Sequence, residues 1–215
     1  MKYNTILFDL DGTLTNPAFG ITNSVIYALK KFGITDVKRE DLYKFIGPPL
    51  IYSFKEYYGF DEEKSKKAVE YYREYFSVKG LYENEIYNGI PELLDFLKKK
   101  GYKIVLATSK PEKFANEILK YFDIEKYFDF VVGATMDEKR NQKNQVIEYA
   151  LSLISDNDKS KTVMVGDRCY DIIGAFENGI DSIGVLYGFG DFAELNSSGA
   201  TYIAETILYL KDILK

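Results

Sequence analysis

The chain has 215 residues and a formal net charge of −5, from 28 basic and 33 acidic side chains. Its 46% of hydrophobic residues can bury a substantial core, and its length suits one domain with a large insertion or two small domains. The acidic balance argues against a nucleic-acid partner, which needs clustered Lys and Arg. No segment approaches the ~18–20 consecutive apolar residues that span a bilayer, so we expect no membrane partner.

Two residue counts exclude several kinds of chemistry. The sequence has no histidine and a single cysteine, Cys169. Catalytic Ser-His-Asp triads, phosphohistidine and His-ligated zinc are therefore excluded, as is an intrachain disulfide. A cysteine-dependent phosphatase would need an arginine six residues after Cys169, where the sequence has Ala175. The single cysteine suits a reducing cytosol, and acidic residues in the first apolar stretch argue against a secretory signal, so we expect a cytoplasmic protein.

The predicted elements begin with a short buried strand at Thr5–Phe8. The following stretch, 16–88, contains no convincing strand and is punctuated by glycine and proline. Four helices are expected there, at Ile21–Phe32, Arg39–Phe45, Leu50–Tyr58 and Glu62–Phe76. We therefore expect a helical domain over 16–88, inserted into a core domain made of 1–15 and 89–215.

After this insertion, short apolar strands alternate with amphipathic helices. The further expected strands are Ile104–Ala107, Phe130–Val132, Val163–Val165 and Ser182–Leu186. The expected helices are Glu92–Lys100, Glu112–Phe122, Asn144–Leu153 and Asp171–Asn178. This alternation predicts an α/β fold with a doubly wound, Rossmann-like parallel sheet.

Polar side chains follow the strands where each one ends, and ligands bind at those ends in doubly wound sheets. The residues concerned are Asp9, Asp11, Gly12, Thr13, Thr108, Ser109, Lys110, Asp167 and Asp171, with Lys143 opening a nearby helix. Four crowded carboxylates repel one another unless a cation lies among them, and an all-oxygen ligand set favours Mg²⁺ over Zn²⁺. A divalent cation with lysine and hydroxyl groups suits phosphoryl transfer.

The first two aspartates suit the chemistry of such a transfer. Asp9 could attack phosphorus directly and form an aspartyl-phosphate. Asp11 could protonate the leaving alkoxide and then deprotonate the hydrolytic water. Gly12 leaves room for backbone N–H groups to approach a phosphate.

These motifs resemble those of the haloacid dehalogenase superfamily. The segment Asp9-Leu10-Asp11-Gly12-Thr13-Leu14 resembles its first motif, Thr108 its second, Lys143 its third, and Gly166-Asp167 with Asp171 its fourth. The 99-residue interval between Asp9 and Thr108 suits members that carry a helical cap there. Dehalogenases lack the second aspartate of the first motif, so the presence of Asp11 argues against dehalogenation.

The resemblance implies a role for each matching residue. Asp9 would be the nucleophile and a metal ligand, and Asp11 the general acid and base with its backbone carbonyl on Mg²⁺. Thr108 and Lys143 would hold the phosphoryl group, Asp167 would bind the metal directly, and Asp171 would bind it through water or orient its surroundings. The residues expected to contact substrate are Gly12, Thr13, Ser109, Lys110 and Gly47, the last at the tip of the cap.

Some residue assignments have plainer alternatives. Lys139 and Arg140 share one loop-to-helix junction with Lys143, which we choose because the helical pattern starts there. Asp171 could simply cap the helix that follows it. Ser109 and Lys110 could merely complete the turn before a proline.

Within the superfamily, the closest likeness is to phosphoglycolate-phosphatase-like and 5′-nucleotidase-like hydrolases, on the segments Gly166–Asn178 and Phe45–Pro49. The expected function is Mg²⁺-dependent hydrolysis of a small phosphorylated metabolite. Sugar phosphomutases have a Ser-Arg pair after the corresponding cap glycine, where this chain has Pro48-Pro49. A mutase and a receiver-like phosphoacceptor signalling protein are the alternatives, and the sequence specifies no oligomeric state.

Overall fold

The computed structural model describes residues 2–136, 139–155 and 158–215. Its internal contacts form two compact units, Met1–Asn16 with Ile86–Lys215, and Pro17–Glu85. We call the first the α/β unit and the second the helical unit. The expected core and cap domains, with boundaries at 15/16 and 88/89, stay a prediction.

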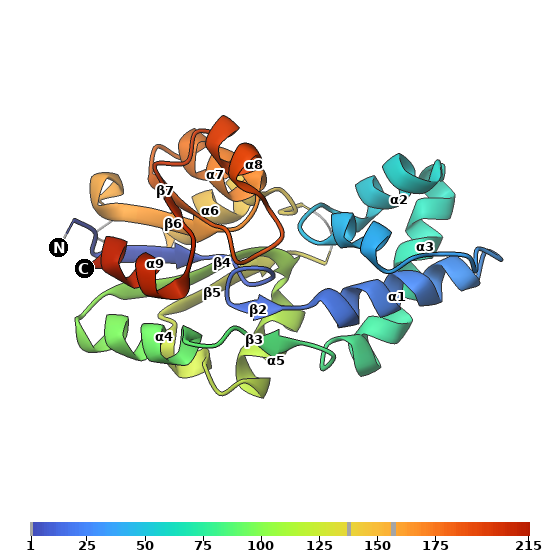
Figure 1. Ribbon diagram of the computed structural model, residues 1–215, viewed down its shortest axis with the longest axis horizontal. Coiled ribbons are helices and arrows are strands. Elements are labelled where there is room, and N and C mark those ends of the chain that lie inside the picture. Colours follow the sequence, from blue (N-terminus) through green and yellow to red (C-terminus); the bar gives the residue numbers. More distant parts are fainter. Residues whose placement is uncertain (1, 137–138, 156–157) are drawn as a thin grey trace. The chain divides into compact units, whose positions relative to one another are not determined.

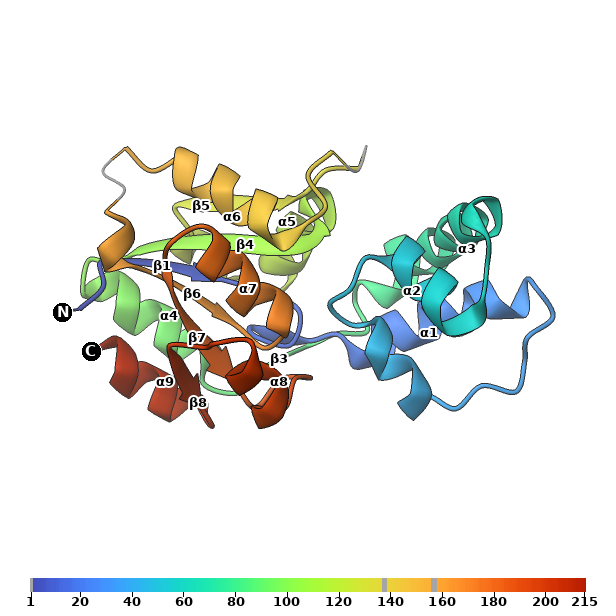
Figure 2. The same ribbon diagram turned by 90° about the horizontal axis from the view of Figure 1, so that it is seen from above.

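The α/β unit is built on one six-stranded parallel sheet (Figures 1 and 2). Its strands lie in the order β5-β4-β1-β6-β7-β8. Their bounds are β1 Thr5–Phe8, β4 Lys103–Pro111, β5 Phe130–Ala134, β6 Thr162–Gly166, β7 Asp181–Val185 and β8 Tyr202–Ala204. The predicted doubly wound fold is therefore confirmed.

The position of β1 determines where a ligand site can form. In register, Leu7 lies between Val105 of β4 and Met164 of β6. The chain adds β4 and β5 on one side of β1 and then crosses to add β6, β7 and β8 on the other. The strand order thus reverses at β1, and the carboxyl end of a strand at such a switch point is where doubly wound sheets bind ligands.

Helices cover both faces of this sheet (Figure 1). Their bounds are α4 Ile90–Lys99, α5 Glu112–Tyr121, α6 Lys143–Ser152, α7 Cys169–Glu177, α8 Phe192–Ser197 and α9 Ile207–Leu214, with short 3₁₀ turns η3 Glu125–Tyr127 and η4 Lys159–Lys161. Apolar residues of α6 at helical spacing, Val146, Ile147 and Ala150, pack against Leu7 and Met164 in one core. The N-terminus of α6 is thereby held near the carboxyl ends of the strands.

Several elements differ from the sequence-based expectation. Strand β1 has its predicted bounds, whereas β4 runs on through a register shift between Ala107 and Pro111. Strands β2 (Thr15–Asn16) and β3 (Glu85–Ile86) pair at the ends of the stretch in which no strand was expected. Strand β8 and helices α8 and α9 lie beyond the last predicted strand and were not predicted.

The helical unit contains α1 Ala18–Lys30, the 3₁₀ helix η1 Glu40–Phe45, α2 Leu50–Tyr58, α3 Glu62–Tyr75 and the π-helical turn η2 Phe76–Gly80. Aromatic rings form much of its interior: Phe45 meets Phe54 edge to face with centroids 5.2 Å apart, and Phe32 meets Phe60 at 5.1 Å. The many tyrosines and phenylalanines of the sequence thus serve mainly in packing here.

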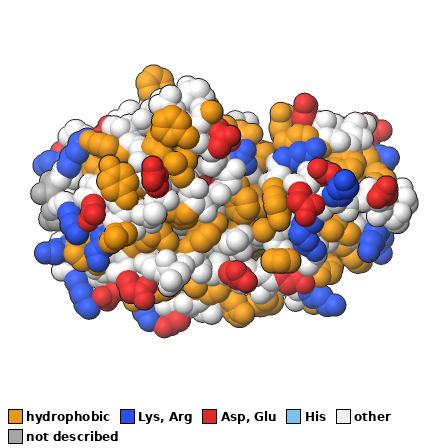
Figure 3. Space-filling view, viewed as in Figure 1, with side chains coloured by type: hydrophobic (Ala, Val, Ile, Leu, Met, Phe, Trp, Pro, Cys, Tyr) orange, Lys and Arg blue, Asp and Glu red, His pale blue; other side chains and the backbone are white. Residues whose placement is uncertain are grey.

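Two observations concern the helix lengths and the surface charge of the described residues. Within 2–136, 139–155 and 158–215, every helix falls short of the length and apolar character required to cross a bilayer. On the face drawn in Figure 3, basic and acidic side chains are interspersed. A nucleic-acid surface would instead gather Lys and Arg in a stripe.

Candidate active site

The site begins where β1 ends. Asp9 follows this fully buried strand, and its backbone N–H donates to the Val165 carbonyl of β6 at 2.9 Å. The chain then turns tightly at Gly12, which has φ +85°. A Cβ atom at this position would lie 2.1 Å from Oδ2 of Asp167, so only glycine fits. The turn brings the first-strand aspartates against the end of β6.

Three carboxylates gather at this point. Asp9, Asp167 and Asp171 are 7%, 0% and 1% exposed, and one oxygen from each lies within 4.8 Å of the others. Burial, reinforced by the charges of Asp171 and Asp9, raises the pKa of Asp167 well above its usual range. Burial also raises the pKa of Asp171, to about 6. The sheet edge therefore concentrates negative charge out of contact with bulk water.

Lys143 lies between two of these acids. Its Nζ is 2.8 Å from Oδ1 of Asp9 and 2.8 Å from Oδ1 of Asp171, and it donates to the Ala107 carbonyl at 3.1 Å. Burial acts to lower the pKa of Lys143, but the two carboxylates outweigh it and raise that pKa. Gly174 of α7 leaves space for this side chain, because a Cβ there would lie 3.1 Å from Lys143 Cγ.

The neighbouring basic residues have other positions. Arg140 donates to the Gly133 carbonyl and to Glu112, both at 3.0 Å, and Lys139 is exposed. Of the three residues at this junction, Lys143 is the one with its ammonium group in the carboxylate cluster.

Asp171 also accepts from the Arg168 backbone N–H at 3.1 Å, so it caps α7 and joins the cluster at the same time.

Asp11 is paired with a different lysine. Nζ of Lys110 lies 2.6 Å from Oδ2 of Asp11, and both side chains are largely buried. Burial raises the pKa of Asp11, and Lys110 opposes this rise only in part. Lys110 lies in the irregular part of β4, where a register shift turns side chains away from the regular alternation. Thr108 is buried beside it and accepts from the Lys110 backbone N–H at 3.2 Å.

The other expected site residues are spread more widely. Thr13 donates to Oδ1 of Asp167 at 3.3 Å and so contacts a carboxylate of the cluster. Ser109 is half-buried on β4, between Thr108 and Lys110. Gly47 belongs to the helical unit and has φ +108°. Substrate contacts by Gly12, Thr13, Ser109, Lys110 and Gly47 stay predictions.

Sequence reasoning missed the segment after β7. The backbone N–H of Phe189 donates to Oδ2 of Asp167 at 2.8 Å. A Cβ at Gly188 would lie 2.4 Å from Asp167 Cβ, and one at Gly190 would lie 2.0 Å from the Asp167 carbonyl oxygen. This loop therefore encloses Asp167 closely. Its signal in the sequence was the pair of glycines just beyond a strand end.

The carboxylate cluster has the properties of a cation site. Lys143 pairs with Oδ1 of Asp9 and with Oδ1 of Asp171, whereas Oδ1 of Asp11 is buried and has no hydrogen-bond partner among the described residues. One ammonium group offsets only part of the charge of three close carboxylates. The remaining buried charge is costly unless another cation binds. Asp9, Asp167 and Asp171 fit a hard divalent ion by donor type and by closeness.

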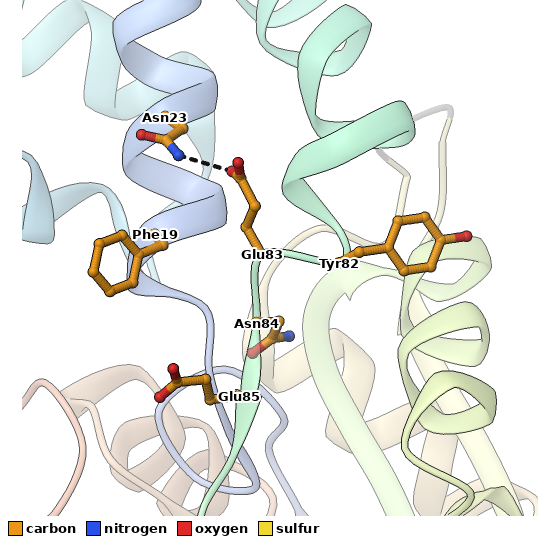
Figure 4. Close-up of a pocket in the computed structure, with 6 residues that line it drawn as sticks. All are labelled: Phe19, Asn23, Tyr82, Glu83, Asn84 and Glu85. Atoms are coloured by element: carbon orange, nitrogen blue, oxygen red, sulfur yellow. Dashed lines mark hydrogen bonds between the residues drawn. The ribbon is translucent and has the colours of Figure 1, made fainter.

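A hollow lies in the helical unit, and Figure 4 shows its lining. This cavity of about 300 Å³ is lined by Phe19, Asn23, Tyr82, Glu83, Asn84 and Glu85. Glu83 accepts from Asn23 at 2.8 Å and from Tyr75 at 2.9 Å. Arg39 in turn donates to Asn23 at 2.8 Å. Two of the polar side chains that line the hollow, Asn23 and Glu83, thus bond each other.

The fold and the carboxylate site together define a doubly wound α/β protein with a candidate cation site at the carboxyl ends of its strands. The chain belongs to the haloacid dehalogenase-like hydrolases, whose sequence pattern matches residues 6–185.

Relatives and solved structures agree with this membership. The chain is 43% identical to a 5′-nucleotidase of Pseudomonas aeruginosa, over 100% of this chain and 97% of that one. It is 33% identical to pyrophosphatase PpaX of Bacillus mycoides (100% and 98%) and 36% identical to tyrosine-protein kinase PtkA of Mycobacterium tuberculosis (97% and 72%). A crystal structure described as a predicted phosphatase from Clostridium acetobutylicum matches with a TM-score of 0.96 and 48% identity, covering 100% and 99% of the two chains.

Proposed function

We propose that this phosphatase hydrolyses a small phosphate monoester with Mg²⁺, through an aspartyl-phosphate on Asp9. The observation that carries the proposal is the buried cluster of Asp9, Asp167 and Asp171 with Lys143 between two of its members. Asp9, Asp167 and Asp171 would hold the metal ion. When bound, Mg²⁺ supplies positive charge that offsets the repulsion among the carboxylates and the phosphoryl group.

The first half of the reaction forms a bond between Asp9 and phosphorus. A carboxylate oxygen of Asp9 attacks phosphorus while the bond from phosphorus to the ester oxygen breaks. Asp11, two residues further along, donates its proton to the departing alkoxide, which leaves as an alcohol. Its burial and raised pKa support this role, because a general acid must hold its proton near neutral pH. Lys143 and Thr108 would hold the phosphoryl oxygens.

The second half returns the enzyme to its starting state. Asp11, now ionised, takes a proton from water while the water oxygen attacks phosphorus, and the bond between Asp9 and phosphorus breaks. The products are inorganic phosphate and the original Asp9 carboxylate. The ion pair with Lys110, at 2.6 Å, supports the ionised form of Asp11 that this step requires.

The substrate class is proposed from the relatives. The 43% identity to a 5′-nucleotidase over the full length supports a nucleoside monophosphate, and the resemblance in sequence leaves phosphoglycolate as the other candidate. The pyrophosphatase relative adds pyrophosphate to the compounds worth testing. All three offer a terminal phosphoryl group to the same nucleophile.

A phosphate-release assay with an aryl phosphate tests the proposal. Wild type should need Mg²⁺ and lose its activity in EDTA, and Asp9→Asn should lose turnover by several orders of magnitude. Asp95→Asn is the matched control, because the Asp95 side chain is 42% exposed and pairs with Lys99 on the same helix. An Asp9→Asn protein with wild-type turnover would rule out the mechanism. Transfer to an acceptor without phosphate release would indicate a mutase or kinase instead.

A further inference from the structure

The loop that follows β7 contains a tyrosine hydroxyl with an unusual environment. The hydroxyl oxygen of Tyr187 is buried and has no hydrogen-bond partner among the described residues. Two other tyrosine hydroxyls of the α/β unit have partners: Tyr3 donates to Asp181 at 2.6 Å, and Tyr102 donates to the Leu214 carbonyl. A buried hydroxyl without a partner destabilises a fold, because it loses its hydrogen bonds to water and no protein group replaces them. The burial of the Tyr187 hydroxyl therefore requires an explanation other than packing.

The backbone around Tyr187 is fixed against Asp167. Two residues further on, the Phe189 N–H donates to Oδ2 of Asp167 at 2.8 Å. The residue between them, Gly188, approaches so closely that a Cβ would lie 2.4 Å from both Asp167 Cβ and the Gly12 carbonyl oxygen. Tyr187 is thus anchored beside an expected metal ligand and beside the turn that carries Asp11.

The ring of Tyr187 packs against the ring of Tyr87. The two rings meet edge to face, with centroids 5.2 Å apart and planes at 70°. Tyr87 is tied to the first-motif loop, because its backbone N–H donates to the Leu14 carbonyl at 3.1 Å. The aromatic pair therefore connects the loop after Asp11 with the loop around Asp167.

Electrostatics agrees with this placement. Burial raises the pKa of the Tyr187 phenol, and the Asp167 carboxylate raises it further. Burial also raises the pKa of Tyr87, and the charges of Asp167 and Asp11 raise it further. Both phenols therefore keep their protons at neutral pH, so Tyr187 can act as a neutral hydrogen-bond donor.

We propose that Tyr187 is a positioning residue of the active site, whose hydroxyl donates a hydrogen bond to an oxygen that a bound ligand brings beside Asp167. This inference rests on the proposed function. The oxygen can come from a water molecule on the divalent ion or from the phosphoryl group. In either case, binding supplies the partner that the protein itself does not.

The substitution Tyr187→Phe removes the hydroxyl and keeps the ring, so it isolates this hydrogen bond. Thermal unfolding of the metal-free protein is measured first, then unfolding in a Mg²⁺ titration, and then in an inorganic phosphate titration at saturating Mg²⁺. Tyr102→Phe is the matched control, because it removes a buried tyrosine hydroxyl that has a partner at the opposite end of the sheet.

The proposal predicts opposite behaviour for the two variants. Metal-free Tyr187→Phe should unfold at the wild-type temperature or above it, whereas Tyr102→Phe should unfold below it. Tyr187→Phe should bind Mg²⁺ or phosphate about fivefold more weakly, the factor that one neutral hydrogen bond contributes. Weaker Mg²⁺ binding indicates that the Tyr187 hydroxyl donates to a water molecule on the metal ion. Weaker phosphate binding with unchanged Mg²⁺ binding indicates that it donates to a phosphoryl oxygen. Tyr102→Phe should keep both affinities.

Wild-type affinity of Tyr187→Phe for both Mg²⁺ and phosphate would overturn the inference. If the metal-free variant then also unfolds at a lower temperature than wild type, Tyr187 behaves as a packing residue. As a second variant, Tyr87→Leu removes the supporting ring and should weaken the binding of the same ligand as Tyr187→Phe does. If wild type itself shows neither Mg²⁺ binding nor phosphate release, the proposed function fails rather than this inference.

Discussion

Lys143 is the buried cation on which the unliganded carboxylate cluster depends, and its replacement by methionine tests that dependence. Methionine keeps much of the length and apolar character of the lysine side chain and removes its charge. The three carboxylates of Asp9, Asp167 and Asp171 would then lie within 4.8 Å of one another without the ammonium group at 2.8 Å from two of them.

The size of the effect follows from burial. The Lys143, Asp9 and Asp171 side chains are 5%, 9% and 1% exposed, so water screens their charges poorly. Removing one partner of a buried ion pair costs about 3–5 kcal/mol, because the remaining charge is left uncompensated. For a chain of this size, each kcal/mol lowers the melting temperature by ~2–4 °C, so metal-free Lys143→Met should melt ~6–20 °C below wild type.

The assay is thermal unfolding monitored by circular dichroism, at pH 8 in EDTA, where Asp171 of the wild-type protein is ionised. Burial raises the folded-state pKa of Asp171 to about 6, above its unfolded value of ~3.9, so its protonation favours the folded state. That contribution is present at low pH and is lost as the pH rises through about 6. The deficit of Lys143→Met should therefore shrink at pH 5, where the carboxylate is protonated.

Lys98→Met is the matched control. Lys98 also makes a 2.8 Å ion pair, with Asp129, but both side chains are about one-third exposed. Such pairs contribute ~0.2–1 kcal/mol, so the control should melt within a few degrees of wild type. Equal melting temperatures for Lys143→Met and Lys98→Met in EDTA at pH 8 would refute the argument that burial makes the cluster depend on Lys143.

Two further predictions concern packing and pH. Gly188→Ala should lower turnover more than tenfold and stability by ~1–3 kcal/mol, because the new methyl group would meet Asp167 Cβ at 2.4 Å; unchanged kinetics would contradict this packing. Although partial burial acts to raise the pKa of Asp181, hydrogen bonds from Tyr3 and Lys2 hold it below its usual value. Asp181→Asn should therefore lose ~0.5–1 kcal/mol from pH 5 to 8, and urea unfolding should show the difference shrinking as the pH falls below the unfolded-state pKa of ~3.9 and through the lowered folded-state pKa. A difference that grew on acidification would contradict this assignment.

Much of the fold follows from local pattern in the sequence. The strand Thr5–Phe8 and the helix Leu50–Tyr58 have the bounds that their apolar runs and flanking residues predict. Strand β4 extends further than predicted because Thr108–Pro111 is too polar to resemble a buried strand, yet its pairing with β5 continues to Pro111. Strand β8 is three residues long and partly exposed, so it carries little periodic signal.

The candidate site, like the fold, could be predicted from the sequence only in part. Strand ends can be read from a sequence, and the topology then brings Asp9, Asp167 and Asp171 together. The choice between lysines depends on how far each side chain reaches, and here Lys143 meets two acids while Lys110 meets Asp11. The loop at Gly188 depends on close packing against Asp167, which no local pattern encodes.

Capture of the phosphorylated enzyme tests the central claim most directly. An Asp11→Asn protein lacks the base for hydrolysis but keeps Asp9, so an aryl phosphate with a good leaving group should still phosphorylate it. Rapid mixing should show a burst of about one aryl alcohol per protein, and the mass of the protein should rise by one phosphoryl group on the peptide that contains Asp9. The absence of this adduct, or its appearance on a peptide without Asp9, would contradict nucleophilic attack by Asp9.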